Sequence, residues 1–455
     1  MDTKKLRQKI LDLAIHGKLV PQDPNDEPAS VLLERIRAEK EQLIKEGKIK
    51  APKKSKTAGD TSHYPKEGLW ELPEGWCWST IGETFNLQAG KFIQASDIHE
   101  LSPQYLYPCY GGNGIRGFVS AYNRDGVYPI VGRQGALCGN INYATGKFYA
   151  TEHAVVVETF GGADVNWARY LLEELDLNQY ATATAQPGLS VKRINEVPFP
   201  LPPSEEQKRI AGCLKSTLEY ISQLEGLTSS LCTSVSEIKA KVLDLAIHGK
   251  LVPQNLSDEP AMELLRRINP AFKPSDNLHY MESLPNGWCF STIGDIFQHN
   301  TGKALNGIDR EGVMLRYITT SNLYWDRFDL SEERMMPFTE KEQEKCRAHK
   351  GDLLVCEGGD IGRAAIWPYE ESVMIQNHIH RLRPRTSLSV RFFYYIFYLY
   401  KQKGLIGGKG IGIQGLSSRE LDKMVIPVPP VNEQHRIVTA IEEKFAMLDT
   451  IADCC

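Results

Sequence analysis

Four glycine-rich loops carry polar and basic side chains that could do chemistry on another molecule. They lie at 111–117, 132–135, 358–363 and 407–410. Glycine lets one backbone approach another closely. Arginine can pair with guanine, and asparagine or glutamine with adenine, while lysine and backbone amides suit phosphates. The loops therefore favour recognition of base edges and phosphates, with a plain turn as the alternative for each loop.

Sequence signatures of catalysis are missing. There is no Gly-x4-Gly-Lys-Ser/Thr phosphate loop and no convincing dinucleotide fingerprint. The Asn/Asp-Pro-Pro-Tyr/Phe motif of amino-methyltransferases, a nuclease cluster and a Gly-x-Ser-x-Gly elbow are absent too. His378 and His380 could offer two metal ligands on one face of a strand, but no carboxylate or cysteine pattern accompanies them. We therefore expect a chain without catalytic or metal-binding residues.

Composition fits a soluble globular protein of about three domains, because 42% of the 455 residues are hydrophobic and 24% are charged. The net charge of -4 argues against a protein that simply coats nucleic acid. The placement of charge is uneven, since 375–423 holds nine Lys or Arg against two acids. Scattered cysteines, with no signal peptide or long apolar run, predict a cytoplasmic protein with no membrane segment.

The sequence elements that must position these loops occur twice in the chain. Residues 11–22 return letter for letter as 243–254, 72–82 return with few changes as 284–294, and 200–210 return in part as 427–437. The stretches between them, 83–188 and 295–415, show no comparable match. We call the repeated stretches the frame and the unmatched stretches between them the inserts. A repeated frame around inserts that have diverged indicates that both halves perform the same task on two different targets.

A long helix is predicted from Ser204 to about His248. It follows the helix-blocking Pro202-Pro203, has Ser204 as N-cap and ends at Gly249. A heptad seam runs along it through Leu214, Thr217, Ile221, Leu224, Thr228, Leu231, Val235, Ile238, Val242 and Leu245. This pattern predicts a coiled coil, and the helix would span about 65–70 Å.

The duplication is circular, because 431–455 aligns with 204–228 and 3–17 aligns with 235–249. The two ends of the chain therefore rebuild a second long helix. We expect the central helix to pack antiparallel against these half-helices, with a pseudo-twofold axis relating the inserts. Unrelated local helix bundles are the alternative. The first copy also carries about 20 extra residues in a lysine-rich segment, 37–66, read as a helix to about Lys48 and then a solvated linker or a phosphate contact.

Each insert is expected to mix strands and turns with a helix, which gives an α+β fold class. Predicted strands cover 127–131, 154–157 and 352–355, and predicted helices cover 166–175 and 390–400. The expected domains are an N-terminal half-helix and charged linker (1–65), a first mixed domain (66–200), a central spacer helix (201–270), a second mixed domain (271–428) and a C-terminal half-helix (429–455).

These residues resemble the specificity subunit of type I restriction-modification systems. The most specific features are the circular duplication, PLPPSEEQKRI at 200–210 with PVPPVNEQHRI at 427–437, and the Gly-x-Leu-Val-Pro-Gln helix ends. The motifs at 110–115 and 351–354 look like those of its target-recognition domains. The resemblance covers almost the whole chain.

The resemblance implies a non-catalytic reader of double-stranded DNA. Each insert would be a target-recognition domain for one half of a bipartite site, and the helices would set the spacer and dock two modification subunits. Restriction subunits would complete the assembly. The chain itself would need no cofactor, because S-adenosylmethionine, ATP and magnesium would belong to the partners. Changing the helix by about one turn within 214–245 should alter the gap between the half-sites.

Polar side chains in or beside the loops are our predicted DNA contacts, with a purely structural role as the alternative for each. In the first insert they are Lys91, Asn113, Arg116, Arg133 and Gln134, and in the second Lys303, Arg316, Thr319, Ser321, Asn322, Arg363, Asn377 and Lys409. If Arg133 reads a base, its loss should cost about 1–3 kcal/mol and relax one position of the site.

Three other functions stay open. An insert could hide a nuclease or methyltransferase, which the missing motifs oppose. The chain could be a coiled-coil adaptor that binds only proteins, which a steep salt dependence of DNA binding would exclude. It could also serve a related system whose partner combines methylation and cleavage.

Overall fold

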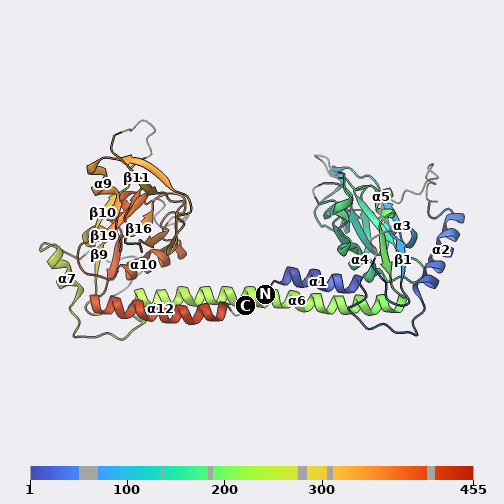
Figure 1. Cartoon of the computed structure of the whole chain (residues 1–455), viewed down its shortest axis with the longest axis horizontal. Coiled ribbons are helices and arrows are strands. Elements are labelled where there is room, and N and C mark those ends of the chain that lie inside the picture. Colours follow the sequence, from blue (N-terminus) through green and yellow to red (C-terminus); the bar gives the residue numbers. More distant parts are fainter. Residues whose placement is uncertain are drawn as a thin grey trace. The chain divides into compact units, whose positions relative to one another are not determined.

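The computed structural model describes residues 2–50, 70–135, 137–182, 188–274, 284–304, 311–406 and 416–453. The chain divides into two compact units, Met1–Leu227 (unit 1) and Thr228–Cys455 (unit 2). In each unit an insert of strands and short helices packs beside long helices (Figure 1). Lys409 and most of the lysine-rich segment lie outside the described residues.

Unit 1 combines three helices of the frame with a sheet-rich insert. The frame is α1 (Thr3–Ile15), α2 (Ala29–Lys45) and the first part of α6 (Ser204–Ile247). The insert contains β1 (Cys77–Thr80), α3 (Ile81–Thr84), β2 (Asn86–Ala89), η1 (Ala95–Asp97), β3 (Tyr107–Gly111), β4 (Gly114–Val119), β5 (Arg124–Gly132), β6 (Ile141–Ala150), β7 (Ala154–Glu158), α4 (Val165–Glu174), η2 (Leu177–Tyr180), α5 (Val191–Asn195) and β8 (Pro198–Leu201). Its main sheet has the order β2-β7-β5-β6-β3-β4, and β1 pairs with β8.

Unit 2 repeats this plan with a different insert. Its frame is the rest of α6, α7 (Ala261–Ile268) and α12 (Val431–Asp453). The insert contains β9 (Cys289–Thr292), α8 (Ile293–Ile296), β10 (Phe297–Thr301), β11 (Val313–Ile318), β12 (Leu323–Tyr324), β13 (Arg327–Phe328), β14 (Arg334–Phe338), α9 (Glu340–Cys346), β15 (Arg347–Ala348), β16 (Leu353–Cys356), β17 (Ala364–Ile366), β18 (Val373–Ile375), β19 (Ile379–Pro384), α10 (Val390–Gln402), α11 (Ser418–Asp422) and β20 (Val425–Val428). Two four-stranded sheets, β10-β19-β16-β17 and β14-β11-β18-β15, replace the single large sheet of unit 1, while β12 pairs with β13 and β20 with β9.

The predicted elements are confirmed within about two residues at most of their ends. The strands expected at 127–131, 154–157 and 352–355 fall on β5, β7 and β16, and the helices expected at 166–175 and 390–400 are α4 and α10. The mixed helix and sheet content of both units agrees with an α+β fold. None of the helices in the described ranges is long and apolar enough to cross a bilayer.

The long helix α6 begins at Ser204 and ends at Ile247, as the proline pair and Gly249 predict. Within unit 1, α1 lies beside it, and Arg7 forms a 2.8 Å ion pair with Glu225. Within unit 2, α12 lies beside it, and Lys239 pairs with Asp449 (Figure 1). The predicted seam is only partly buried, because Leu214 is 1% exposed whereas Leu224 is 46% exposed. The heptad pattern therefore located the helix but overstated how much of its seam is covered.

The residues that are repeated in the two copies form the contact between frame and insert, which we call the joint. Trp76 donates a 2.9 Å indole hydrogen bond to Glu206, and Trp288 donates a 3.0 Å hydrogen bond to Glu433. Burial raises the pKa of both carboxyl groups, while the hydrogen bonds from tryptophan oppose that shift. Each joint is closed by an arginine–aspartate pair, Arg209–Asp26 in unit 1 and Arg436–Asp258 in unit 2. Because the joint is built identically, the two inserts leave the frame in the same way.

Substitution of Gly17, at the end of the repeated helix, tests how tightly this joint is packed. Its φ of +64° suits glycine, and a Cβ there would lie 2.5 Å from Cγ of Pro73. We expect Gly17→Ala to lower the free energy of unfolding by about 2 kcal/mol, because strain in the left-handed region alone costs about 1–3 kcal/mol. Thermal or urea unfolding of the full chain measures this change.

Gly212 provides the matched control, since it lies in α6 and a Cβ there would have no neighbour within 4 Å. Gly212→Ala should raise stability by about 0.5–1 kcal/mol, because alanine favours a helix over glycine. Equal effects of the two substitutions would contradict the packing argument.

Candidate nucleic-acid interface

Three glycine-containing loops of unit 1 meet where strands of the main sheet end. We call this the loop edge of unit 1 and define it as residues 90–91, 110–113, 132–135 and 151–153. Backbone hydrogen bonds join its parts: Thr151 N–H donates to Tyr110 O (3.0 Å), Lys91 N–H to Ala150 O (3.0 Å) and Arg133 N–H to His153 O (2.9 Å). Segments far apart in sequence are therefore held together by main-chain contacts.

Glycine makes this close assembly possible. A Cβ on Gly132 would lie 1.9 Å from the carbonyl oxygen of Gly112, and a Cβ on Gly90 would lie 2.0 Å from that of Ala150. Both contacts are with backbone, so a side chain cannot be accommodated by a rotamer change. The polar residues that follow these glycines are consequently presented from a fixed main-chain platform.

A cavity of about 690 Å³ opens at the loop edge of unit 1. Its walls are Gly112, Asn113, Ile115, Arg116, Gln134, Gly135, His153 and Gly188. Three predicted contacts, Asn113, Arg116 and Gln134, thus line one exposed cavity, with Lys91 exposed beside it. Within the described part of the chain, no hydrogen bond or ion pair engages the guanidinium of Arg133. The site offers several unoccupied donors to an outside partner.

Unit 2 has an equivalent loop edge, which we define as residues 302–303, 318–321, 356–359 and 376–378. Gln376 N–H donates to Ile318 O (3.0 Å), Lys303 N–H to Ile375 O (3.0 Å) and Glu357 N–H to His378 O (2.9 Å). These bonds match those of unit 1 one for one, although the inserts share no comparable sequence. Lys303 therefore corresponds to Lys91, and the predicted contacts Thr319, Ser321 and Asn377 lie on the same edge.

Most predicted contacts of unit 2 are already engaged inside the protein. Lys303 donates to Pro337 O and to Glu342, both at 2.9 Å, and this lysine holds the pKa of the Glu342 carboxyl below its usual value. Arg316 donates to Leu330 O at 3.3 Å, and Arg363 donates to Thr320 O at 2.7 Å. Their use as DNA contacts stays a prediction, which would require these internal bonds to be exchanged.

The turn at Thr319–Asn322 is also built from its own side chains. Asn322 is 5% exposed, accepts from the Thr319 N–H (3.0 Å) and hydroxyl (3.1 Å), and donates to Asp329 O (2.9 Å). Thr319 is 8% exposed, whereas Ser321 is exposed. Of these residues only Ser321 is exposed, and its hydroxyl oxygen lies 2.8 Å from that of Thr319.

His380 is held within the core of unit 2. It is fully buried, its ring nitrogens lie 2.9 Å from His299 Nε2 and 2.7 Å from Leu416 O, and burial, reinforced by His299, lowers its pKa to about 4. His299 in turn lies 2.8 Å from Asp422. His378 instead projects to the loop edge. His378 and His380, the two possible metal ligands on one face of a strand, therefore have different surroundings.

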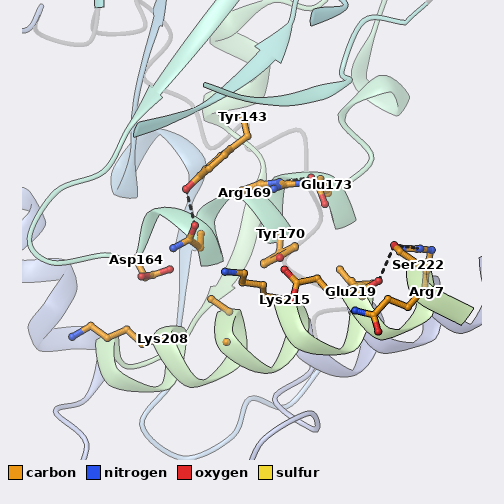
Figure 2. Close-up of a pocket in the computed structure, with 15 residues that line it drawn as sticks. Arg7, Tyr143, Asp164, Arg169, Tyr170, Glu173, Lys208, Lys215, Glu219 and Ser222 are labelled. Atoms are coloured by element: carbon orange, nitrogen blue, oxygen red, sulfur yellow. Dashed lines mark hydrogen bonds and ion pairs between the residues drawn. The ribbon is translucent and has the colours of Figure 1, made fainter. Parts of the chain in front are cut away.

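A second cavity of unit 1, about 860 Å³, lies between α4 and the helices α1 and α6 (Figure 2). Three of its four cations pair with acids in or near its wall: Arg7 with Glu225, Arg169 with Glu173 and Lys208 with Glu205. Figure 2 shows Tyr143 reaching from the sheet toward α4, where its hydroxyl donates a 2.6 Å hydrogen bond to Asn166. Because most of its cations already face carboxylates, this cavity is less suited to phosphate than the loop edge.

Two side chains that the sequence does not mark also lie at the loop edges. His153 lines the cavity of unit 1, and Glu357 occupies the corresponding edge of unit 2. No local motif marks them, since the inserts match only at isolated positions such as Gly90-Lys91 and Gly302-Lys303. Only the matching backbone hydrogen bonds reveal that these positions correspond.

Comparison with known proteins gives consistent matches along the chain. The model of the type I restriction modification DNA specificity domain matches twice, at 73–229 and 285–451. The Escherichia coli type I restriction enzyme EcoEI specificity subunit is 27% identical over 557 aligned positions, which cover 98% of this chain and 90% of that protein. The EcoprrI specificity subunit of the same species is 44% identical over 162 residues, covering 35% of this chain and 38% of that relative.

A solved structure supports the fold. The HsdS subunit from Thermoanaerobacter tengcongensis aligns with a TM-score of 0.50 at 17% identity, covering 85% of this chain and 93% of that one. The resemblance noted in the sequence is thus confirmed by a family model that covers well over half of the chain. The protein belongs to the family defined by the type I restriction modification DNA specificity domain and carries two copies of that domain.

Proposed function

We propose that this protein is the DNA-recognition subunit of a type I restriction-modification complex, in which each unit reads one half of a bipartite site. The main support is that both units build an equivalent loop edge with the same backbone hydrogen bonds but carry different side chains on it. Equivalent platforms with different side chains suit the reading of two different base sequences. Family membership supports the same role.

The side chains of unit 1 support direct base reading there. Asn113 and Gln134 can pair with adenine, and Arg116 and Arg133 with guanine. Lys91 suits a phosphate contact that positions the duplex without reading it. In unit 2, Ser321 and Asn377 supply hydroxyl and amide groups at the corresponding edge, and Lys409 remains a predicted contact outside the described residues.

The helical frame is proposed to dock the catalytic partners. Apolar side chains on α6 in unit 1 are exposed, namely Tyr220 (65%), Leu224 (46%) and Leu227 (68%), and on α12 in unit 2 Met447 is 68% exposed. Exposed apolar rows mark sites of protein association. Two modification subunits would bind there and supply S-adenosylmethionine, and restriction subunits would supply ATP-driven, magnesium-dependent cleavage. The complex would act in the cytoplasm.

We further propose that the paired helices form a coiled coil whose length sets the gap between the half-sites. Two readers on a rigid spacer must keep a fixed separation and rotational phase on the duplex. The partly exposed seam of α6 leaves apolar positions that partner helices can complete.

The decisive experiment expresses the full chain with its cognate modification subunit and reads which adenines become methylated by single-molecule sequencing. We expect a split motif with a fixed unspecified gap. A continuous motif would contradict the two-reader proposal. Absence of any methylation despite an active modification subunit, together with no DNA binding by the chain even at low salt, would instead favour an adaptor that binds only proteins.

A further inference from the structure

The two loop edges carry opposite charges at one equivalent position. Arg133 directly follows β5 and Glu357 directly follows β16. The backbone N–H of each donates a 2.9 Å hydrogen bond to the carbonyl of a histidine, His153 in unit 1 and His378 in unit 2. The two residues therefore start from the same main-chain position, but one presents a guanidinium and the other a carboxylate.

The strands next to this position confirm the correspondence. Gly132, the last residue of β5, pairs with Ala154 at the start of β7. Cys356, the last residue of β16, pairs with Ile379 at the start of β19. Because both pairings are antiparallel and end at the same point, the side chain of the following residue leaves the sheet at the same place in each unit.

The Glu357 carboxylate is available to an outside donor. Its side chain is 32% exposed, and its one ion-pair partner among the described residues is the His378 ring, which is charged only when protonated and whose Nδ1 lies 3.8 Å from Oε2, beyond hydrogen-bond distance. The residues that follow are Gly358 and Gly359, which have no side chains to cover it. Little inside the described protein therefore compensates its charge.

A carboxylate beside DNA must face a hydrogen-bond donor, because phosphates repel it. In the major groove, cytosine presents its N4 amino group as a donor, and glutamate is a recognised partner for that group. Adenine also presents an amino group, but its N7 acceptor lies beside it and suits an amide better than a second carboxylate oxygen. The chemistry of Glu357 thus selects cytosine.

We propose that Glu357 determines specificity in unit 2 by accepting a hydrogen bond from the N4 amino group of a cytosine, at the position where Arg133 reads a guanine in unit 1. This inference rests on the proposed function. It assigns opposite base preferences to one structural position and explains why an acidic residue stands at an edge that approaches a polyanion.

The test compares Glu357→Gln and Glu357→Ala with the unaltered protein, each in complex with its cognate modification subunits. Methylated motifs are read by single-molecule sequencing, and methylation rates are measured on duplexes that vary each base of the second half-site. Both substitutions should reduce the preference for cytosine at one position by about 10-fold to 100-fold. The first half-site should be unchanged, and methylation of duplexes lacking that cytosine should rise because repulsion from phosphate is removed.

Two further variants make the result specific. Arg133→Ala should relax one position of the first half-site and leave the second unchanged. Glu370→Gln removes a carboxylate that also belongs to unit 2, is 83% exposed and pairs with Lys350, and it should alter neither half-site. Melting temperatures of all variants should stay close to that of the unaltered protein.

The outcomes separate this proposal from the function on which it rests. A split motif whose second half-site keeps every base preference in both Glu357 variants would overturn the assignment and leave the two-reader function intact. An equal loss on all sequences would overturn it too, since that result indicates a structural role. Failure of the unaltered complex to give a split motif would instead overturn the proposed function.

Discussion

Gly132→Ala should abolish recognition of the first half-site while leaving unit 2 able to contact its own half. The added Cβ would lie 1.9 Å from the carbonyl oxygen of Gly112, and neither backbone can move alone. The loops that carry Asn113 and Gln134 would be forced apart, so several base contacts would be lost together. With each bidentate contact worth about 1–3 kcal/mol, we expect methylation of the bipartite site to fall at least about 100-fold.

Gly188→Ala is the matched control for this substitution. Gly188 lines the same cavity, but a Cβ there would lie 3.8 Å from the nearest atom, the Thr182 hydroxyl, which is an ordinary contact. Methylation kinetics on the cognate duplex, with a melting temperature for each variant, compare the two. If both variants methylate normally, the loop edge of unit 1 does not form the recognition surface.

Arg383→Ala should destabilise unit 2 by about 3 kcal/mol, at the lower end of the range for breaking a buried ion pair because Arg383 is partly exposed. Asp352 is 2% exposed, and its two carboxylate oxygens accept from Arg383 at 2.8 and 2.6 Å. The His349 N–H donates the third bond, at 2.8 Å. Removing the guanidinium would leave a buried carboxylate held by one backbone donor.

The double substitution Asp352→Ala with Arg383→Ala tests the cause of that loss. If an uncompensated charge is responsible, the double variant should be more stable than Arg383→Ala alone. Urea unfolding of the four proteins in the cycle supplies the comparison. Additive losses would show that Arg383 acts through packing rather than through its charge.

The frame could be predicted from sequence because its determinants are local. Proline before Ser204 and glycine after the helix fix both ends of α6, and the repeated letters coincide with the joint at Trp76 and Glu206. The strands β5, β7 and β16 were predicted because each contains a short, mostly apolar run of valine, isoleucine or leucine bounded by turn-forming or polar residues. The partial exposure of the seam could not be found in this way, because burial depends on which helix lies opposite.

The sequence predicts the contacts of the loop edge better in unit 1 than in unit 2, and the reason is physical. In unit 1, glycine-rich loops with exposed polar tips do meet at one cavity, which composition alone could suggest. In unit 2, similar composition serves a different purpose, because Lys303 and Asn322 stabilise the loops from within. The distinction depends on partners outside each loop, Glu342 for Lys303 and Asp329 for Asn322, and no local spacing records them.

The identical joints have a consequence for how such a chain can change its target. A segment bounded on one side by the Trp76 or Trp288 motif and on the other by the Glu206 or Glu433 motif makes the same anchoring hydrogen bonds in either place. Genetic exchange between these boundaries would replace one whole reader without disturbing the scaffold. Because the repeated stretches are also the most similar in sequence, they are natural crossover points. New combinations of half-sites could therefore arise by recombination, with no need for a series of intermediate point mutations.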